Sequence, residues 1–575
     1  AELPPARRFG LGLLMMRVKL DQPVTTRDGV RLSADIYLPA ADGPFPVLAL
    51  RTIEDNQATE AIRWIPRFIE AGYAVVTEDC RGRFDSGGEW EPYVHEMSDG
   101  HDLIEWISSQ PWSDGNVGMF GSGYSGYTQT RAALGDSKAL KAIAPTSSQQ
   151  DNFGYWFTHG PFQWHTALRF LETTGRTLQS GALALSSWEE LWSRLPLASA
   201  FDDVTEVPFY MQGLQHNRYD EFWKSDSLLD RYGDIDVPAL FITGWYDVLL
   251  HETVQMFQGF TVGAGTEEAR TKSKLIIGPW HSGNLGSGSP SDDVDFGPDC
   301  GVDLAAEHLR WFDQRLRDID TGIDDEPPVR IFTMGENVWR FEDEWPPASM
   351  NYTKFFLHGG GNANSVSGDG CLDYERCGDD EPVDEFIYDP ESPVPTLGGS
   401  VGRLPGIVAG AVDRRPIQQR DAVLVYDTDV LKEDLEVTGS PLVTLWGSSD
   451  CTDTDFAATV CDVHEDGHAT IVCEGMVRTR FSQERQDSSA SRENPKLAVP
   501  GLVSKYFVSL WHTSIVFKAG HRIRLELTSS NFPRFDRNPN TGHDLGVDAQ
   551  IRPAENRVYH NGDYPTHLTL PVVER

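Results

Sequence analysis

One stretch decides the fold of this chain: Gly118-Met119-Phe120-Gly121-Ser122-Gly123-Tyr124-Ser125-Gly126. It continues the apolar run at 117–120 and leads into a helix-forming segment that ends near Gly135. Small residues crowded where a strand turns into a helix are what a nucleophile elbow needs, because its apex sits in a strained turn and its neighbours must lack bulk. The stretch therefore predicts a strand, a sharp corner and a helix that follows it.

Apolar runs alternate with helical patterns on both sides of this corner. The region 61–71 is typical of a helix, which Gly72 ends. Short apolar runs bounded by turn residues are found at 46–50, 73–77, 117–120, 142–144, 239–242 and 275–277. Strands separated by helices predict a largely parallel sheet.

The character of the sequence changes twice along the chain. Between about 150 and 230, aromatic residues lie among helix formers without a strand signal, which predicts a helical insertion over the sheet. After about 326 the pattern becomes all-β. Apolar and charged residues alternate over 522–527, and Asp466-Gly467 separates two further strand-like runs, as in a hairpin.

The length and composition of the chain limit the partners and the cellular compartment that we expect for it. The 575 residues exceed the ~250–300 that one hydrophobic core supports, so we expect several domains. With 49 basic and 87 acidic side chains, the net charge of −38 argues against nucleic acid. No run approaches the roughly 20 apolar residues of a membrane span, and 11–16 lacks a cleavage-site pattern, so we expect a cytoplasmic protein without a membrane partner, with a removed leader left open. The expected partner is a small-molecule substrate. The oligomeric state stays open, a homodimer included.

The cysteines and glycines give no sign of a metal or cofactor. None of the seven cysteines forms a Cys-x2-Cys pair, so we expect no zinc cage and mostly reduced thiols. A small loop disulfide between Cys371 and Cys377 is the one pairing left open. No Gly-x-Gly-x-x-Gly motif follows a strand and no P-loop is present, so no cofactor is predicted.

Two later motifs supply partners for the corner. Asp247 ends Gly244-Trp245-Tyr246-Asp247, and His281 ends Gly278-Pro279-Trp280-His281. An elbow, then an acid, then a histidine is the order of the catalytic groups in α/β-hydrolases.

Together with further motifs, this order resembles one known family. Those motifs are Arg27-Asp28-Gly29-Val30-Arg31-Leu32, Asp79-Cys80-Arg81-Gly82-Arg83, Tyr388-Asp389-Pro390, Asp453-Thr454-Asp455-Phe456 and Gly520-His521-Arg522. Nearly the whole chain is similar to the bacterial cocaine esterase / X-Pro dipeptidyl-peptidase (CocE/NonD) hydrolases. The resemblance implies an α/β-hydrolase core at 1–150 and 231–325, a helical cap at 151–230, and a C-terminal β jelly-roll domain at 326–575.

The chain departs from the family's pattern at three positions. Where the family has Gly-x-Ser-Tyr-x-Gly, Gly123 stands at the nucleophile position. Where the family has Arg-x-Pro-Tyr, with a tyrosine that donates to the oxyanion, Glu54 stands at the tyrosine position. The family also spaces one residue between Trp and the catalytic His, whereas His281 directly follows Trp280. Asp247 is unaltered.

These departures oppose ordinary serine catalysis. Glycine cannot be acylated, and loss of the nucleophile costs a serine hydrolase about a millionfold in turnover. A carboxylate at position 54 would repel a developing oxyanion. We therefore expect non-covalent acid/base chemistry, with Asp247 orienting His281 and Glu54 as a general acid: cyclisation, elimination, isomerisation or direct water attack on a partly apolar acyl compound.

Predicted substrate contacts and alternatives complete the hypothesis. The expected contacts are Ser122, Gly123, Tyr124, Trp164 and Trp245; the resemblance implies that the Tyr124 backbone N–H donates to the oxyanion. One alternative is a conventional ester or amide hydrolase or aminopeptidase that uses Ser122 or Ser125 as the nucleophile. Another is a non-catalytic ligand-binding protein. A third interpretation pairs Glu54 with Arg51 or Arg81 and leaves His281 as a loop histidine.

Overall fold

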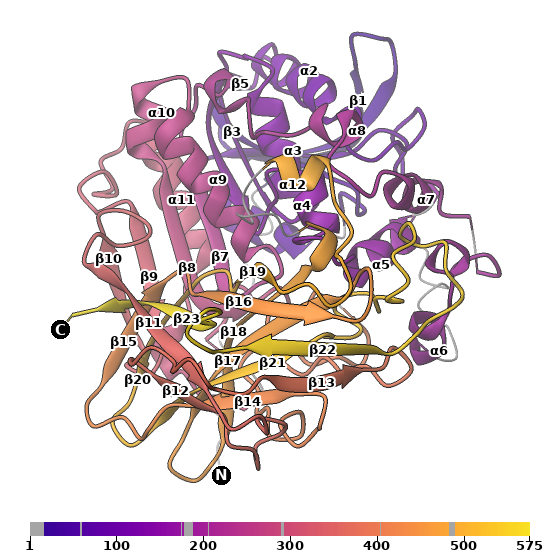
Figure 1. The fold of residues 1–575 in the computed structure, drawn as a ribbon. Coiled ribbons are helices and arrows are strands. Elements are labelled where there is room, and N and C mark those ends of the chain that lie inside the picture. Colours follow the sequence, from indigo (N-terminus) through magenta and orange to yellow (C-terminus); the bar gives the residue numbers. More distant parts are fainter. Residues whose placement is uncertain are drawn as a thin grey trace, which may run out of the picture.

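The computed structural model describes residues 16–57, 60–173, 175–177, 188–204, 206–288, 293–402, 404–481 and 489–574. An α/β half and an all-β half lie against each other (Figure 1). Most of the apolar segment at 11–16 lies outside the described residues. The predicted fold class, an α/β-hydrolase core with helices followed by a C-terminal all-β domain, is confirmed.

The first sheet positions the site. Among the described residues it has ten strands in the order β1-β2-β4-β3-β5-β6-β7-β8-β9-β10. Their bounds are β1 (Met16–Thr25), β2 (Arg31–Pro39), β3 (Phe45–Thr52), β4 (Ala74–Asp79), β5 (Ser113–Ser122), β6 (Leu140–Thr146), β7 (Leu240–Tyr246), β8 (Lys274–His281), β9 (Val329–Thr333) and β10 (Val338–Glu342). Neighbours from β4 and β3 through to β9 are parallel, so the six predicted apolar runs are confirmed as β3 to β8.

Helices cover both faces of this sheet, so its strands are apolar on both sides. Leu48 and Leu50 of β3 face the cluster that contains α1 and α11, whereas Val47 and Ala49 face the cluster that contains α2, α3 and α9. The helices are α1 (Ile65–Glu70), α2 (Glu96–Ser108), α3 (Tyr124–Ala133), α9 (Leu250–Gly263), α10 (Glu267–Lys272) and α11 (Leu304–Leu316).

The cap lies between β6 and β7 in the chain. Its described helices are α4 (Asn152–Trp156), α5 (Trp164–Thr173), α6 (Trp188–Ser193), α7 (Pro208–Gln215) and α8 (Glu221–Lys224). Aromatic side chains form its own apolar core, in which Trp156 packs against Phe170 and Trp223 with tilted rings at centroid distances of 5.1 and 5.6 Å. This cluster explains the density of aromatic residues between 150 and 230.

Strands follow one another after about 326, as the sequence predicts, but the first two belong to the first sheet. β9 and β10 continue that sheet, because β9 pairs in parallel with β8, and the second sheet starts at β11. Its strands are β11 (Met350–His358), β12 (Cys371–Asp373), β13 (Asp384–Tyr388), β14 (Leu424–Asp427), β15 (Leu435–Gly439), β16 (Leu442–Ser449), β17 (Asp455–Val463), β18 (Ala469–Arg478), β19 (Ser504–Ser509), β20 (Thr513–Phe517), β21 (Arg522–Thr528), β22 (Ala554–Tyr559) and β23 (His567–Val573). The predicted hairpin at Asp466-Gly467 joins β17 to β18.

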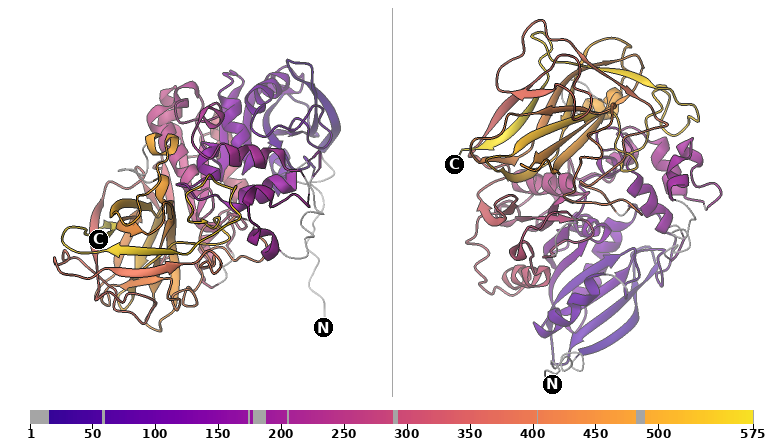
Figure 2. Two further views of the ribbon diagram at one scale, coloured as in Figure 1. Left: turned by 45° about the vertical axis from the view of Figure 1, so that its right-hand side comes forward. Right: turned by 90° about the horizontal axis from the view of Figure 1, so that it is seen from below.

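A short helix ties the two halves together. α12 (Ser489–Glu493) leaves the all-β half and lies among the helices of the other half (Figures 1 and 2). Its Arg492 donates to Asp151 at 2.9 Å, and its backbone carbonyl accepts from the N–H of Tyr219. The all-β half therefore contacts the cap directly.

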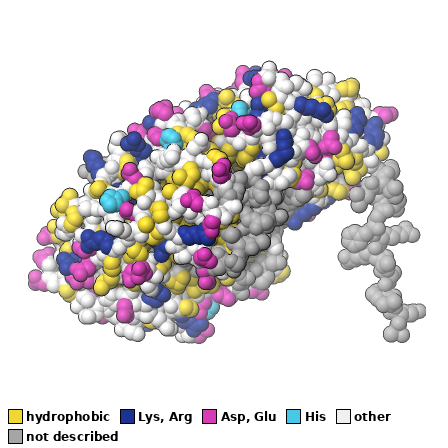
Figure 3. Space-filling view, turned by 90° about the vertical axis from the view of Figure 1, so that its right-hand side faces the viewer, with side chains coloured by type: hydrophobic (Ala, Val, Ile, Leu, Met, Phe, Trp, Pro, Cys, Tyr) yellow, Lys and Arg dark blue, Asp and Glu magenta, His cyan; other side chains and the backbone are white. Residues whose placement is uncertain are grey.

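The surface carries both signs of charge. On the face drawn in Figure 3, acidic and basic side chains are interspersed with apolar ones. Within the described ranges, every helix is too short or too polar to cross a membrane.

Candidate active site

The carboxyl ends of five parallel strands point to one cavity. The residues that follow β3, β5, β6, β7 and β8 include Glu54, Gly123, Ser147, Asp247 and Ser282. In parallel α/β sheets this edge is where ligands bind. A cavity of about 170 Å³ lies there, smaller than the roughly 300–1,000 Å³ of drug-sized ligand sites, so it fits a small molecule or one end of a larger one. Its lining is Glu54, Tyr93, Ser122, Gly123, Tyr124, Ser147, Gln149, Tyr155, His165, Leu168, Arg169, Glu172, Val248, Leu249, Ser282, Leu285 and Gly402.

Gly123 retains the positive-φ backbone of an elbow. Its φ of 59° and ψ of −122° lie where side chains are strained, and its N–H donates to the carbonyls of Thr146 and Ser147, both at 3.0 Å. A Cβ built on Gly123 would meet nothing within 4 Å. The corner therefore has the shape that presents a side chain to the cavity, and open space where that side chain would be.

The neighbouring glycines are required by packing. A Cβ on Gly121 would lie 2.6 Å from the Cβ of Ser125, and one on Gly126 would lie 2.9 Å from the Cβ of Ser148. The two serines proposed as substitutes differ in position. Ser125 is buried in this packing, whereas Ser122 is exposed and lines the cavity.

The hydroxyl of Tyr124 is hydrogen-bonded within the protein, so its backbone N–H is the group that can serve a ligand. Its hydroxyl donates to Glu96 at 2.9 Å and accepts from the N–H of Tyr93 at 3.0 Å, and burial raises its pKa well above the usual range. As the first residue of α3, its N–H has no acceptor within the helix. That N–H is therefore the candidate donor to a ligand oxygen at the cavity.

Asp247 is fully buried and hydrogen-bonded by hydroxyls. Its Oδ1 accepts from Ser147 Oγ at 2.8 Å, from Ser282 Oγ at 3.3 Å and from the N–H of Leu249 at 2.7 Å. Its Oδ2 has no hydrogen-bond partner in the described part of the chain. Burial raises the pKa of Asp247, against the lowering effect of these hydrogen bonds.

The structure does not bring His281 to Asp247. The parallel ladder pairs His281 with Tyr246, so Ser282 is the residue beside Asp247. Successive side chains on a strand point to opposite sides, and only one of the two can face the acid. His281 Nδ1 instead accepts from the N–H of Gly283 at 3.0 Å. The expectation that Asp247 orients His281 is therefore wrong, and the family's histidine position, one residue further from Trp280, is Ser282.

Glu54 is held by an arginine of the cap. Arg169 of α5 donates to Glu54 Oε1 at 2.6 Å, with side chains 28% and 32% exposed. The arginines considered as partners are bonded elsewhere: Arg51 to Glu78 and Glu96, and Arg81 to Asp28 and Asp99. Paired with a guanidinium, Glu54 is a carboxylate, which favours a base over the predicted general acid.

One face of α5 supplies a wall of the cavity, most of which the sequence analysis missed. His165, Leu168, Arg169 and Glu172 recur at helical spacing and all line the cavity. Arg169 also lies 3.7 Å from Glu172. Burial, with a contribution from Arg534, lowers the pKa of His165 to about 3, so its imidazole is neutral at physiological pH. The helical spacing of these four residues is the signal in the sequence that could have predicted this wall of the cavity.

The two tryptophans expected to contact substrate belong to the core. Trp245 is 2% exposed and its Nε1 donates to the carbonyl of Phe332 at 2.7 Å. Trp164 is 1% exposed and packs against Phe162 and Phe201 in the cap cluster. Neither is part of the cavity lining, because both are held inside apolar clusters.

Four larger cavities in the described part of the chain, of about 310 to 520 Å³, lie outside this group of strand ends. The largest of these four is lined by the cap and the all-β half, and another, of about 380 Å³, lies beside Glu252 and Arg492. None of the four is lined by Gly123, Glu54 or Ser282. The strand-end cavity is the candidate active site because the elbow, Glu54 and the Tyr124 N–H meet there.

Comparisons with known proteins agree with this architecture. Residues 28–283 match the X-Pro dipeptidyl-peptidase (S15 family) model, and 321–569 match the X-Pro dipeptidyl-peptidase C-terminal non-catalytic domain. The chain is 36% identical to the cocaine esterase of Rhodococcus sp. strain MB1 Bresler, over 96% of this chain and 98% of that protein.

Two solved structures share the fold along the whole chain. An aminopeptidase from a marine sediment archaeon, Thaumarchaeota archaeon, has a TM-score of 0.83 at 23% identity, covering 100% of this chain and 99% of that one. An α-amino acid ester hydrolase has a TM-score of 0.81 at 24% identity, covering 100% of both.

Proposed function

Because the chain belongs to the cocaine esterase / X-Pro dipeptidyl-peptidase (CocE/NonD) family, and is therefore an enzyme of the α/β-hydrolase superfamily, we propose that it acts without that family's acyl-enzyme. The proposed chemistry is proton transfer on a small, partly apolar acyl compound: cyclisation, elimination, isomerisation or direct attack by water. Glu54 is the proposed proton-transfer group.

One observation carries this proposal. The elbow backbone persists at Gly123 with open space at its apex, while the residue after β8 that donates to Asp247 is Ser282. Nucleophile and base are thus both replaced at the positions that the family uses. Glycine adopts this positive-φ backbone without the strain that a side chain would carry, so the corner keeps its shape without its nucleophile.

The remaining groups suit a non-covalent reaction. The Glu54 carboxylate takes a proton from substrate carbon, from a substrate hydroxyl or amine, or from water, and returns it to the product. Arg169 holds that carboxylate in place and offsets the negative charge that develops on substrate. The Tyr124 N–H donates to the acyl oxygen at the positive end of α3.

Two hydroxyls complete the cavity wall. Ser147 and Ser282 both donate to Asp247, so their oxygens keep lone pairs that accept from a substrate N–H or O–H. Their orientation is fixed by a buried carboxyl, which makes them positioning residues. The open volume above Gly123 then holds the reacting acyl carbon.

A second candidate function is ordinary ester or amide hydrolysis with Ser122 as the nucleophile. It is favoured by the exposure of Ser122 on the cavity and by the esterase among the relatives. This alternative requires a base for Ser122, which Glu54 would have to supply.

Labelling with a fluorophosphonate, read by intact-protein and peptide mass spectrometry, separates the two functions. The proposal expects no adduct at 119–126 or on Ser147 or Ser282, together with conversion of at least one compound in a panel of esters, lactones and amides. An adduct on Ser122 assigns the conventional mechanism. Binding of panel compounds without any conversion would assign a ligand-binding role instead.

A further inference from the structure

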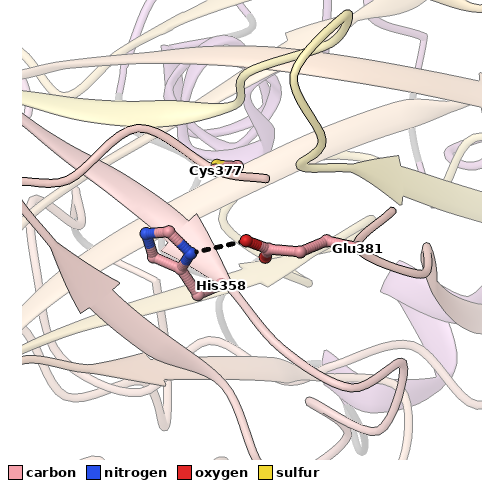
Figure 4. A group of neighbouring side chains, drawn as sticks. All are labelled: His358, Cys377 and Glu381. Carbon is pink, nitrogen blue, oxygen red and sulfur yellow. Dashed lines mark hydrogen bonds and ion pairs between the residues drawn. The ribbon is translucent and has the colours of Figure 1, made fainter. Parts of the chain in front are cut away.

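Three potential metal ligands meet at one edge of the all-β half, far along the chain from the candidate active site. His358 ends β11, and Cys377 and Glu381 lie in the loop that precedes β13. One atom of each, the imidazole nitrogen, the sulfur and a carboxylate oxygen, lies within 4.8 Å of the other two. Figure 4 shows the His358 ring and the Glu381 carboxylate facing each other, with Cys377 beside them.

The tautomer of His358 is fixed by its surroundings. Nε2 lies 3.0 Å from the backbone carbonyl of Glu375, and a carbonyl only accepts, so Nε2 carries a hydrogen. In the neutral ring, Nδ1 then presents a lone pair to Glu381 Oε1 at 2.9 Å. Two acceptors at that distance repel unless a positive charge lies between them, either a second proton or a metal ion.

Glu381 is itself oriented by a buried network. His560, which is fully buried, lies 3.3 Å from Glu381 Oε2 and 2.8 Å from Asp384 Oδ2. Both oxygens accept, so His560 donates from both nitrogens; burial lowers its pKa, but these two hydrogen bonds raise it overall. Glu381 thus keeps Oε1 directed at His358. A ligand imidazole bonded to a carbonyl, beside a ligand carboxylate bonded by a histidine, is the usual outer shell of a metal site.

Cys377 supplies the soft ligand. Its thiol is buried and donates to the carbonyl of Leu357, and burial raises its pKa to about 11. A bound metal ion deprotonates such a thiol. One thiolate, one carboxylate and one neutral imidazole around a dication sum to zero charge, which suits a half-buried site.

We propose that His358 Nδ1, Cys377 Sγ and a Glu381 oxygen bind one Zn²⁺ ion that fastens the acidic loop before β13 to the end of β11. Sulfur, nitrogen and oxygen ligands in tetrahedral geometry are the zinc preference, with a fourth position for water or another side chain. The register places Cys371 opposite His358, but its sulfur is not part of the group within 4.8 Å, so water is the expected fourth ligand. The absence of Cys-x2-Cys pairs argued against a cysteine cage, whereas this mixed set draws its histidine from a strand 19 residues before Cys377.

A second group serves as the internal comparison. Asp462, His464 and His521 also lie within 4.8 Å of one another. This group has no sulfur, and Asp462 is already hydrogen-bonded to His521 at 2.8 Å. Any ion there would have nitrogen and oxygen ligands alone, so a spectroscopic signature of thiolate ligation distinguishes the two sites.

The test uses the full-length protein, reduced, stripped with a chelator and titrated with Co²⁺ and then Zn²⁺. We expect one Co²⁺ per chain with a sulfur-to-cobalt charge-transfer band, displaced by one equivalent of Zn²⁺. Cys377→Ser removes the band, and His358→Gln weakens Zn²⁺ binding at least tenfold. His464→Gln and Cys473→Ser, as matched controls, leave both unchanged. Circular dichroism checks the fold of each variant.

Several outcomes would overturn the proposal. They are an unmodified chain that shows no thiolate band, a band that survives Cys377→Ser, or zinc binding that His464→Gln abolishes. The first needs no variant, so a misfolded mutant cannot obscure the result. Thiol counting on the stripped protein adds a further check, because a Cys371–Cys377 disulfide that persists under reducing conditions excludes the site.

Discussion

The hydroxyl of Ser282 lies 3.3 Å from Oδ1 of Asp247 and donates a hydrogen bond to it, in the place where the family has its histidine. Ser147 donates to the same oxygen at 2.8 Å, whereas Oδ2 is buried without a hydrogen-bond partner among the described residues. The acid of the original triad is therefore intact, with its second oxygen available to an imidazole N–H.

Restoring the two missing groups should restore serine-hydrolase chemistry. Gly123→Ser adds a hydroxyl at an apex whose Cβ meets nothing within 4 Å, and Ser282→His with His281→Ser places an imidazole beside Asp247. Loss of either nucleophile or base costs a serine hydrolase about a millionfold, so the triple variant should hydrolyse p-nitrophenyl butyrate orders of magnitude faster than the unmodified chain. Fluorophosphonate should label position 123.

The controls for the triple variant are the single and the double variant from which it is built. Gly123→Ser alone lacks a base, and the His281/Ser282 exchange alone lacks a nucleophile, so each should stay near the unmodified rate. Equal gains from Gly123→Ser alone would show that another group already acts as the base. Labelling without turnover would mean that Glu54 blocks the oxyanion, which Glu54→Tyr in the same background tests directly.

Much of this site is visible in the sequence because its determinants are local. Crowded small residues define the corner at Gly123, and the motif ending at Asp247 follows a buried strand. The adjacency of Trp280 and His281 is equally visible, but its consequence depends on strand parity: a shift of one residue turns a side chain to the other face. Only the ladder that pairs His281 with Tyr246 shows that Ser282 faces the acid.

The partner of Glu54 could not be predicted in the same way. Arg169 lies 115 residues further along the chain, on a cap helix whose placement over the sheet depends on tertiary packing. The nearer arginines are occupied by buried acids, which no local pattern reveals. Trp164 and Trp245 illustrate the converse, because large aromatic residues beside a motif are more often packed than exposed.

Glu54→Gln tests the proposed proton-transfer group. The amide keeps the shape and accepts from Arg169 but cannot hold a proton, so turnover should fall by roughly 10²–10⁴-fold. The measurement is the initial rate on whichever panel compound the unmodified enzyme converts. Glu172→Gln, on the other side of Arg169, is the matched control and should lose far less.

His281→Ala tests the histidine that the sequence analysis assigned to catalysis. Its Nδ1 accepts from the Gly283 N–H, and Asp247 is hydrogen-bonded by Ser282 in its place, so we expect a smaller loss of turnover than from Glu54→Gln. The same panel compound and conditions apply. A loss as large as that of Glu54→Gln would return His281 to the catalytic group and require its ring to reorient during turnover.

Arg169→Gln should separate stability from activity. A partly exposed ion pair contributes about 0.2–1 kcal/mol, so the free energy of unfolding should change by less than about 1 kcal/mol. Turnover should fall strongly, because Glu54 loses its orientation and the substrate loses a countercharge. Arg169→Lys should recover part of it, since the charge returns without the planar fork.

The control for Arg169 is another cap arginine. Arg194 forms ion pairs with Asp203 and Glu190 and does not line the cavity. Arg194→Gln should match Arg169→Gln in thermal unfolding while leaving turnover unchanged. If both variants lost activity together, the effect would belong to the cap as a whole and not to the contact with Glu54.

The contribution of Asp79 to stability should fall as pH rises from about 4 to 7. Burial raises the pKa of Asp79 to about 7, against an unfolded value near 3.8, so the folded chain keeps this proton longer. Its contribution is fully present below pH ~4 and is lost as pH rises through 7, at about 1.4 kcal/mol per unit. In urea unfolding across this range, Asp79→Asn should flatten the decline. Parallel pH profiles for Asp79→Asn and the unmodified chain would show that Asp79 is ionised throughout the range.

Asp28 has the opposite effect on the pH dependence of stability. The hydrogen bond from Arg81 lowers the pKa of Asp28, so its contribution to stability is lost on acidification, and Asp28→Asn should remove that contribution.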